Sequence, residues 1–177
     1  MRLRATAAIV TAATLALAAV PDAEGQNQET AQAFFSGLLQ NDPGTTAPVK
    51  ALLKTGGAFV SPQPTFADLT GDGKSDAVVT VENGGAAGVV ALYVFSADGA
   101  KDGHPRAVFR SQRLWQGHTH IRGATLTVVT PEWSKGDAPC CATKLLEREY
   151  EWSAGSRRFV RRAVREISGP GAPPSQR

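Results

Sequence analysis

Cysteine and histidine, which often supply metal ligands and catalytic groups, are scarce in this sequence. Two cysteines and three histidines occur in 177 residues. The motifs GxSxG and HExxH are absent, and the Gly-rich stretch at 84–88 lacks the Lys-Ser/Thr of a phosphate-binding loop. Isolated Ser, His and Asp residues do not indicate a triad, because a triad assembles in space. We therefore expect a non-enzymatic protein.

Long hydrophobic runs are also rare, and the one present lies near the N-terminus. Residues 5–20 are apolar and Ala-rich; Arg2 and Arg4 precede them, and the small-x-small triplet Ala-Glu-Gly follows at 23–25. This order is typical of a secretory signal peptide, and the run is too short for a transmembrane helix. We expect cleavage near Gly25. The mature protein should have no transmembrane helix and should be secreted, periplasmic or in the cell envelope.

Neither sign of charge is in strong excess, because the formal net charge is +3. A positive balance of this size does not indicate a nucleic-acid partner. Removal of the predicted signal peptide, 1–25, leaves about 150 residues, which suits one domain with its own core. We place this single domain at 26–168. The Pro-, Gly- and Ser-rich segment 169–177 is expected to be a disordered tail.

Hydrophobic periodicity changes from helical to alternating along the domain. Apolar residues recur at helical spacing over 28–40, and a second short helix is expected over 48–53. From Phe66 onward the spacing favours strands, and segment 89–95 is apolar on both faces, as in a central strand. The expected strands cover 76–82, 89–95, 107–114, 119–130, 143–152 and 157–164. The fold class is α+β, with the N-terminal helix packed on an antiparallel meander sheet of five or six strands.

An acidic loop precedes the first of these strands. Calcium takes six to eight oxygen ligands on a short loop that turns at a glycine. The side chains of Asp68, Thr70, Asp72 and Asp76, with the backbone carbonyl of Lys74, offer such a ligand set. Val79 stands where an EF-hand needs its bidentate acid, and a strand follows instead of a helix. The loop is therefore not an EF-hand.

The same loop resembles the DxDGDGxxD loop of FG-GAP and VCBS-type repeats, in which a calcium loop joins two strands. The match covers Asp68, Gly71, Asp72, Gly73 and Asp76. Thr70 departs from it, since that family has a second Asp there, and this chain has one copy where the family has tandem repeats. The resemblance implies Ca²⁺ as a cofactor. The alternative, which we favour, is a turn in which Asp side chains accept hydrogen bonds from nearby backbone amides.

The two cysteines, Cys140 and Cys141, are neighbours. In an exported protein two cysteines usually indicate one disulfide, and no other cysteine is available in the chain. A vicinal disulfide, two free thiols and intermolecular bonds all remain open. We favour a structural link within a loop, because nothing nearby resembles a thioredoxin motif.

Three further groups of residues have both a functional and a structural interpretation. His118 and His120 would share one side of a strand, but a zinc site needs a third ligand, so we expect surface residues. Five arginines near the C-terminus could form the basic face of a helix that meets anionic lipid or wall polymer, or pair across a hairpin with Glu147, Glu149 and Glu151; we favour the hairpin. These arginines are Arg157, Arg158, Arg161, Arg162 and Arg165.

Four aromatic residues form the third of these groups: Trp115, Trp133, Tyr150 and Trp152. They could line a carbohydrate-binding surface, or they could fill the core of a small domain. The core is the commoner use of such side chains, and it is our expectation here.

The order of these features resembles the LppP/LprE family of actinobacterial exported lipoproteins. The matching segments are 68–79, 84–95, 139–141 and 150–159. Two features depart from the family: the lipobox cysteine is missing, and Ala142-Thr143 follows the cysteines where the family has Pro-Ser. The resemblance implies a cell-envelope domain with no established enzymatic activity to carry over, and cell-envelope components as partners.

The combined expectation is an exported domain that acts as a non-enzymatic binding or structural module. One alternative is a calcium-dependent module that uses the Asp68–Asp76 loop. A weaker alternative is a redox or hydrolytic envelope enzyme.

Overall fold

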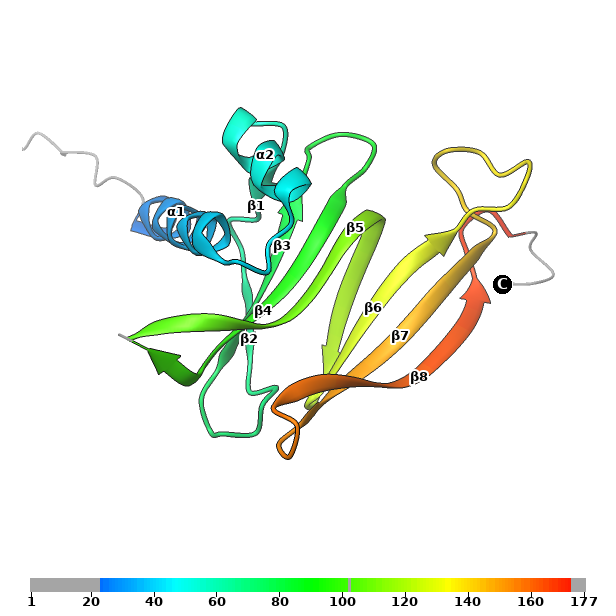
Figure 1. The fold of residues 1–177 in the computed structure, drawn as a ribbon. Helices are drawn as coiled ribbons and strands as arrows, with labels where there is room; N and C mark the ends of the chain where they lie inside the picture. The colour runs from blue at the N-terminus through cyan, green and yellow to red at the C-terminus, as the bar shows by residue number, and fades with distance from the viewer. Residues whose placement is uncertain (1–22, 102, 173–177) are drawn as a thin grey trace, which may run out of the picture.

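The computed structural model describes residues 23–101 and 103–172, which form two helices and an antiparallel sheet of eight strands (Figure 1). The α+β class is confirmed. The helices are α1 (Ala23–Asn41) and α2 (Ala47–Thr55). The strands are β1 (Phe59–Val60), β2 (Thr65–Ala67), β3 (Asp76–Glu82), β4 (Val89–Lys101), β5 (His104–Arg122), β6 (Thr125–Glu132), β7 (Lys144–Ser153) and β8 (Arg158–Ser168).

The expectation of five or six strands was too low. The two extra strands, β1 and β2, have two and three residues, too short for an alternating pattern to show in the sequence. The expected strand over 119–130 is also divided, because Gly123 turns the chain between β5 and β6 with a φ of 58°. That left-handed conformation favours glycine. The predicted signal peptide, apart from residues 23–25 at the start of α1, lies outside the described residues.

The strands follow one another as a meander, in the order β1-β3-β4-β5-β6-β7-β8, and β2 also pairs with β3. The predicted central strand is confirmed, because β4 lies between β3 and β5. Strand β5 belongs to two layers. Its first part pairs with β4, and after a sharp bend its last part pairs with β6 (Figure 1).

Two hydrophobic clusters hold three layers together. The first cluster joins Phe35 and Leu39 of α1 to the side chains of β3 and β4 that face the helices, such as Val79 and Tyr93. The second joins the opposite faces of β3 and β4 to β6, with Leu92 and Val128 among its members. The helices therefore cover one face of the first layer, and β6–β8 cover the other. This explains why β4 is apolar on both faces.

Gln112 of β5 ties the turn between the helices to the first layer. Its side-chain oxygen accepts hydrogen bonds from the Tyr93 hydroxyl at 2.9 Å and from the Thr46 amide at 2.8 Å. Its side-chain nitrogen donates to the Gly44 carbonyl at 3.0 Å. Burial raises the pKa of Tyr93 to about 12, so its hydroxyl remains a donor at ordinary pH.

Neither helix in the described residues combines the length and the hydrophobicity that a bilayer crossing requires.

Candidate binding groove and adjoining loops

An open groove of about 370 Å³ lies between the bend of β5 and the strands β6 and β7. Its aromatic lining consists of Trp115, Trp133 and Tyr150. Trp115 is 50% exposed and Trp133 is 40% exposed. The floor is the edge of the second hydrophobic cluster, since Val128 belongs to both. The volume lies within the range of roughly 300–1,000 Å³ that is typical of small-molecule sites.

The bend of β5 places Trp115 at the groove. The β4–β5 ladder shifts register between the pair Ala91–Gln112 and the pair Val89–Gly117, so residues 113–116 bulge out of it. Arg113 and Gln116, at the two ends of this bulge, have φ values of 66° and 53°. Non-glycine residues rarely adopt this conformation, and where they do the surrounding structure holds them there.

The expectation that the aromatic residues fill the core was wrong for Trp115 and Trp133. It holds better for the other two, which are partly buried against rings of the second hydrophobic cluster. Tyr150 packs edge-on against Phe109, with ring centroids 4.9 Å apart, and Trp152 packs in the same way against Phe159 at 5.5 Å. Tyr150 still reaches the groove, whereas Trp152 does not line it.

Two arginines that the sequence analysis did not single out, Arg113 and Arg148, also line the groove. Arg148 donates a hydrogen bond to the Thr130 hydroxyl at 2.6 Å and lies 3.8 Å from the carboxylate of Glu132. Within the described part of the chain, Arg113 has no ion-pair partner, and none of the lining residues is acidic. The groove is therefore positively charged.

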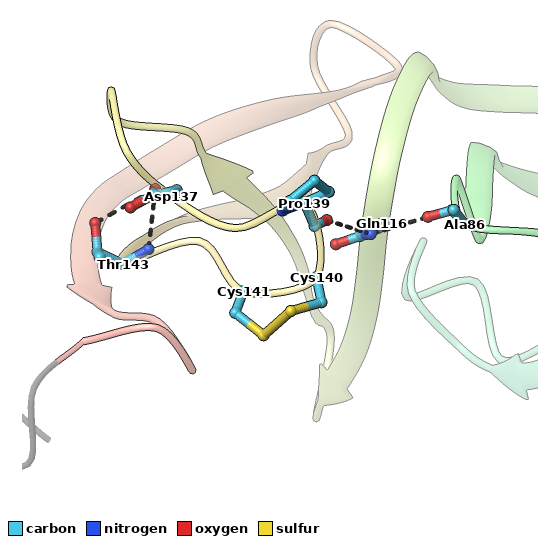
Figure 2. The surroundings of a disulfide bond; sticks show 7 residues. All are labelled: Ala86, Gln116, Asp137, Pro139, Cys140, Cys141 and Thr143. Atoms are coloured by element: carbon cyan, nitrogen blue, oxygen red, sulfur yellow. Dashed lines mark hydrogen bonds between the residues drawn. A yellow bond between two sulfur atoms is a disulfide. The ribbon is translucent and has the colours of Figure 1, made fainter.

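The loop between β6 and β7 carries Trp133 and the two cysteines, which form the vicinal disulfide Cys140–Cys141. Gln116 links this loop to the 84–88 turn, because its side-chain nitrogen donates to the Pro139 carbonyl at 3.2 Å and to the Ala86 carbonyl at 2.9 Å (Figure 2). The disulfide loop and the Trp115 bulge are thus held together next to the groove.

Asp137 fixes the rest of this loop. Its carboxylate accepts a hydrogen bond from the Ser134 amide at 2.8 Å. It also accepts one from the Thr143 amide at 3.1 Å, and the Thr143 hydroxyl lies 3.4 Å away (Figure 2). These bonds hold the pKa of Asp137 below its usual range, and the bond from the Ser134 amide contributes most. Ser134 directly follows Trp133, so this bond fixes the backbone next to Trp133.

The start of the predicted tail packs against the disulfide loop. The Gly169 amide donates to the Thr143 carbonyl at 2.8 Å, and the Gly171 amide donates to the Ala142 carbonyl at 3.0 Å. A Cβ atom at Gly171 would overlap the carbonyl oxygen of Cys141. Residues 173–177 lie outside the described residues.

The acidic loop forms the turn that leads into β3. The Asp68 carboxylate accepts hydrogen bonds from the Gly71 and Gly73 amides at 2.7 and 3.0 Å, and Asp72 accepts one from the Lys74 amide at 2.9 Å. Asp76 is buried and accepts from the Leu69 and Thr70 amides at 2.9 and 2.8 Å; the Thr70 hydroxyl lies 3.4 Å from its second oxygen.

The carboxylates of the acidic loop are therefore directed at backbone amides, as in the turn interpretation. No group of three or more His, Cys, Asp or Glu side chains suited to a metal ion occurs in residues 23–101 and 103–172. Calcium binding stays a prediction.

The histidine pair lies on one exposed side of β5, as expected for His118 and His120. Burial, and then the nearby charge of His120, lower the pKa of His118. Four of the five arginines lie in strand β8, and two of them, Arg162 and Arg165, form the predicted cross-strand ion pairs. Arg165 pairs with Glu147 at 3.4 Å and also with Glu149, and Arg162 pairs with Glu151 at 3.1 Å. Arg157 lies just before β8 and pairs with Asp98 at 3.0 Å instead.

Comparison of the chain with protein-family models, with curated proteins and with solved structures gave no match in any of the three.

Proposed function

We propose that this protein is an exported, non-enzymatic binding module whose binding surface is the groove. The observation that carries this proposal is the exposure of Trp115 and Trp133 on a concave surface. Tryptophan, tyrosine and arginine are the residues that most often dominate binding energy at interfaces. The groove combines all three types.

The chemistry of the groove lining supports binding in preference to catalysis. The lining holds no His, Cys, Asp or Glu, which are the usual sources of general acids, general bases and metal ligands. The calcium-dependent alternative has less support, because the carboxylates of Asp68 and Asp76 already accept backbone hydrogen bonds. The redox alternative has less support because the disulfide lies in a loop that other residues anchor.

The proposal is tested by a screen of soluble glycans, peptides and small metabolites for a rise in melting temperature. The screen compares the mature chain with the double variant Trp115→Ala/Trp133→Ala. A ligand that binds only the folded state raises the midpoint by mass action. At least one ligand should stabilise the parent and not the double variant. Phe66→Ala is the matched control, because Phe66 is 61% exposed and does not line the groove.

Export is tested separately with the full chain expressed in an actinobacterial host. N-terminal sequencing of the exported product should place the mature N-terminus near Gly25. A product that stays inside the cell with residues 1–25 attached would contradict the exported location, whatever the groove binds.

A further inference from the structure

We propose that the ligand of the groove is an acidic saccharide, a chain of sugar rings that carries carboxylate or phosphate groups. This inference rests on the proposed binding function and names the class of ligand. It follows from three properties of the lining: its aromatic faces, its hydroxyl groups and its unbalanced positive charge.

The aromatic faces suit a ring that is apolar on its faces and polar at its edge. Indole and phenol rings have an apolar body, and their π faces attract the positively polarised C–H groups that a sugar ring presents. Trp115 and Trp133 come from different segments, the β5 bulge and the loop after β6, and both reach the groove. A chain of sugar rings offers a face to each indole.

The polar groups of the lining suit the hydroxyl edge of a sugar. Ser111 and Thr130 contribute hydroxyls, which both donate and accept hydrogen bonds. The Thr130 oxygen accepts from Arg148 at 2.6 Å, and this leaves its hydroxyl hydrogen to donate into the groove. Saccharide hydroxyls need this mixture of donors and acceptors.

The charge of the lining favours an anionic ligand over a neutral one. Arg148 is partly balanced by Glu132, but Arg113 has no ion-pair partner among the described residues. A guanidinium presents a planar fork of donors that matches a carboxylate or a phosphate with two parallel hydrogen bonds. A neutral sugar would leave this fork unused.

The sheet edges at the groove are poorly suited to an extended acidic peptide as the ligand. Such peptides gain affinity by adding a strand to an exposed sheet edge. Strand β5 pairs with β4 up to Gly117 and with β6 only from His118, and β6 pairs with β5 only as far as Val129, so both strands have an unpaired edge beside the groove. The bulge at 113–116 breaks the edge of β5, and Pro131 of β6 has no amide hydrogen to donate. The groove therefore offers side chains and no continuous strand edge, which suits a saccharide better.

Isothermal titration of the mature chain tests this inference with four probes. They are an oligogalacturonate, the same oligomer fully methyl-esterified, a phosphomannan oligosaccharide and poly-glutamate. The oligogalacturonate, the phosphomannan or both should bind, and whichever binds should do so at least tenfold more tightly than the esterified oligomer. Arg113→Gln should weaken the acidic saccharide by roughly tenfold to a hundredfold, the effect of losing a charge-assisted hydrogen bond, and leave the esterified form unchanged.

Matched control variants distinguish binding at the groove from nonspecific attraction of the anionic probes to surface arginines. Arg161→Gln removes an exposed charge of β8 that does not line the groove, so it should leave the affinity within about twofold. Trp115→Ala and Trp133→Ala should each lower the affinity for every saccharide that binds the parent. Melting curves of each variant show whether it is folded before it is titrated.

Each other outcome overturns a definite part of the argument. If the esterified and free oligomers bind equally well, the inference that the ligand is acidic is wrong, but the groove is still a binding site. If poly-glutamate binds and Trp115→Ala weakens that binding, while neither acidic saccharide binds, the ligand of the groove is an acidic peptide. If no probe binds, the acidic saccharide is rejected. If, in addition, the wider screen finds no ligand that depends on the two tryptophans, the binding function fails as well.

Discussion

Arg110 of β5 holds Asp42, just after α1, with two parallel hydrogen bonds: Nε donates to Oδ2 at 2.8 Å and Nη2 donates to Oδ1 at 2.7 Å. The two residues are 68 positions apart in the chain. The Asp42 side chain is only 11% exposed, and the pair fastens the end of the first helix to the first layer. Burial alone would raise the pKa of Asp42, but the bonds from Arg110 and Thr45, with the Arg110 charge, lower it overall.

The first prediction concerns the pH dependence of this pair. Because the native pKa of Asp42 lies below its ordinary value of 3.8, its contribution to stability is complete above that value. The contribution is lost as pH falls through the lowered native pKa. Asp42→Asn should destabilise the domain by about 1–2 kcal/mol at pH 7, since the Arg110 end is partly open to solvent. Thermal melts from pH 7 to pH 2 should show the difference between parent and variant shrinking below pH 4. A constant difference over that range would contradict a stabilising role for the ionised Asp42 carboxylate.

The second prediction concerns the buried carboxylate of Asp76. Asp76→Ala would leave the amides of Leu69 and Thr70 without their acceptor, and an unsatisfied buried donor costs about 1–3 kcal/mol. We expect a loss of about 3 kcal/mol in urea unfolding. Asp72→Ala is the matched control, because Asp72 is exposed and accepts one bond from its own turn; it should cost less than about 1 kcal/mol. Equal losses would mean that Asp76 does not have this role.

The third prediction separates the turn from a calcium site. The mature chain should melt at the same temperature in EDTA and in millimolar calcium, because Asp68 and Asp76 already have backbone partners. Asp72→Asn serves as the control in both conditions. A rise in the midpoint with calcium that this variant abolishes would establish a metal site, and would revive the calcium-dependent alternative.

The sequence predicted the main elements because their hydrophobic periods are long and regular. The alternation of Ala77, Val79 and Val81 predicted that they share one face of a strand, and this face packs against α1. The continuous apolar run in β4 predicted a central strand, because both faces of such a strand are buried. Strands β1 and β2 were missed because two or three residues cannot show a period.

The groove was harder to predict, because it depends on a local break in the ladder. Nothing in the sequence shows that Arg113 and Gln116 adopt positive φ, since neither is glycine or asparagine. A signal was available for Arg148: it alternates with Glu147 and Glu149, so it lies on the opposite face of β7, which is the groove side. The two exposed tryptophans could not be told from core residues by type alone.

The fourth prediction concerns the vicinal disulfide. A bond between adjacent residues closes a very small loop, and the entropy that a disulfide removes from the unfolded chain grows with loop length. The double variant Cys140→Ser/Cys141→Ser should therefore lower the free energy of unfolding by only about 1 kcal/mol. Intact mass before and after reduction should show a gain of two hydrogens per chain. A parent protein that carries free thiols as isolated would contradict this and favour the redox alternative.

The last prediction concerns the contact of the C-terminal segment with the disulfide loop. Gly171→Ala would place a methyl group against the carbonyl oxygen of Cys141, which is backbone and cannot move aside cheaply. Overlap of this kind costs about 1–3 kcal/mol, and the segment at 169–172 can relieve it by detaching. We expect the Gly169 and Gly171 amides to exchange with solvent roughly tenfold faster or more, and Cys140–Cys141 to be reduced faster by dithiothreitol. Gly155→Ala is the control, because a Cβ there meets nothing within 4 Å, and both rates should stay at the parent value. If Gly171→Ala also leaves both rates unchanged, the packing of Gly171 does not protect the loop.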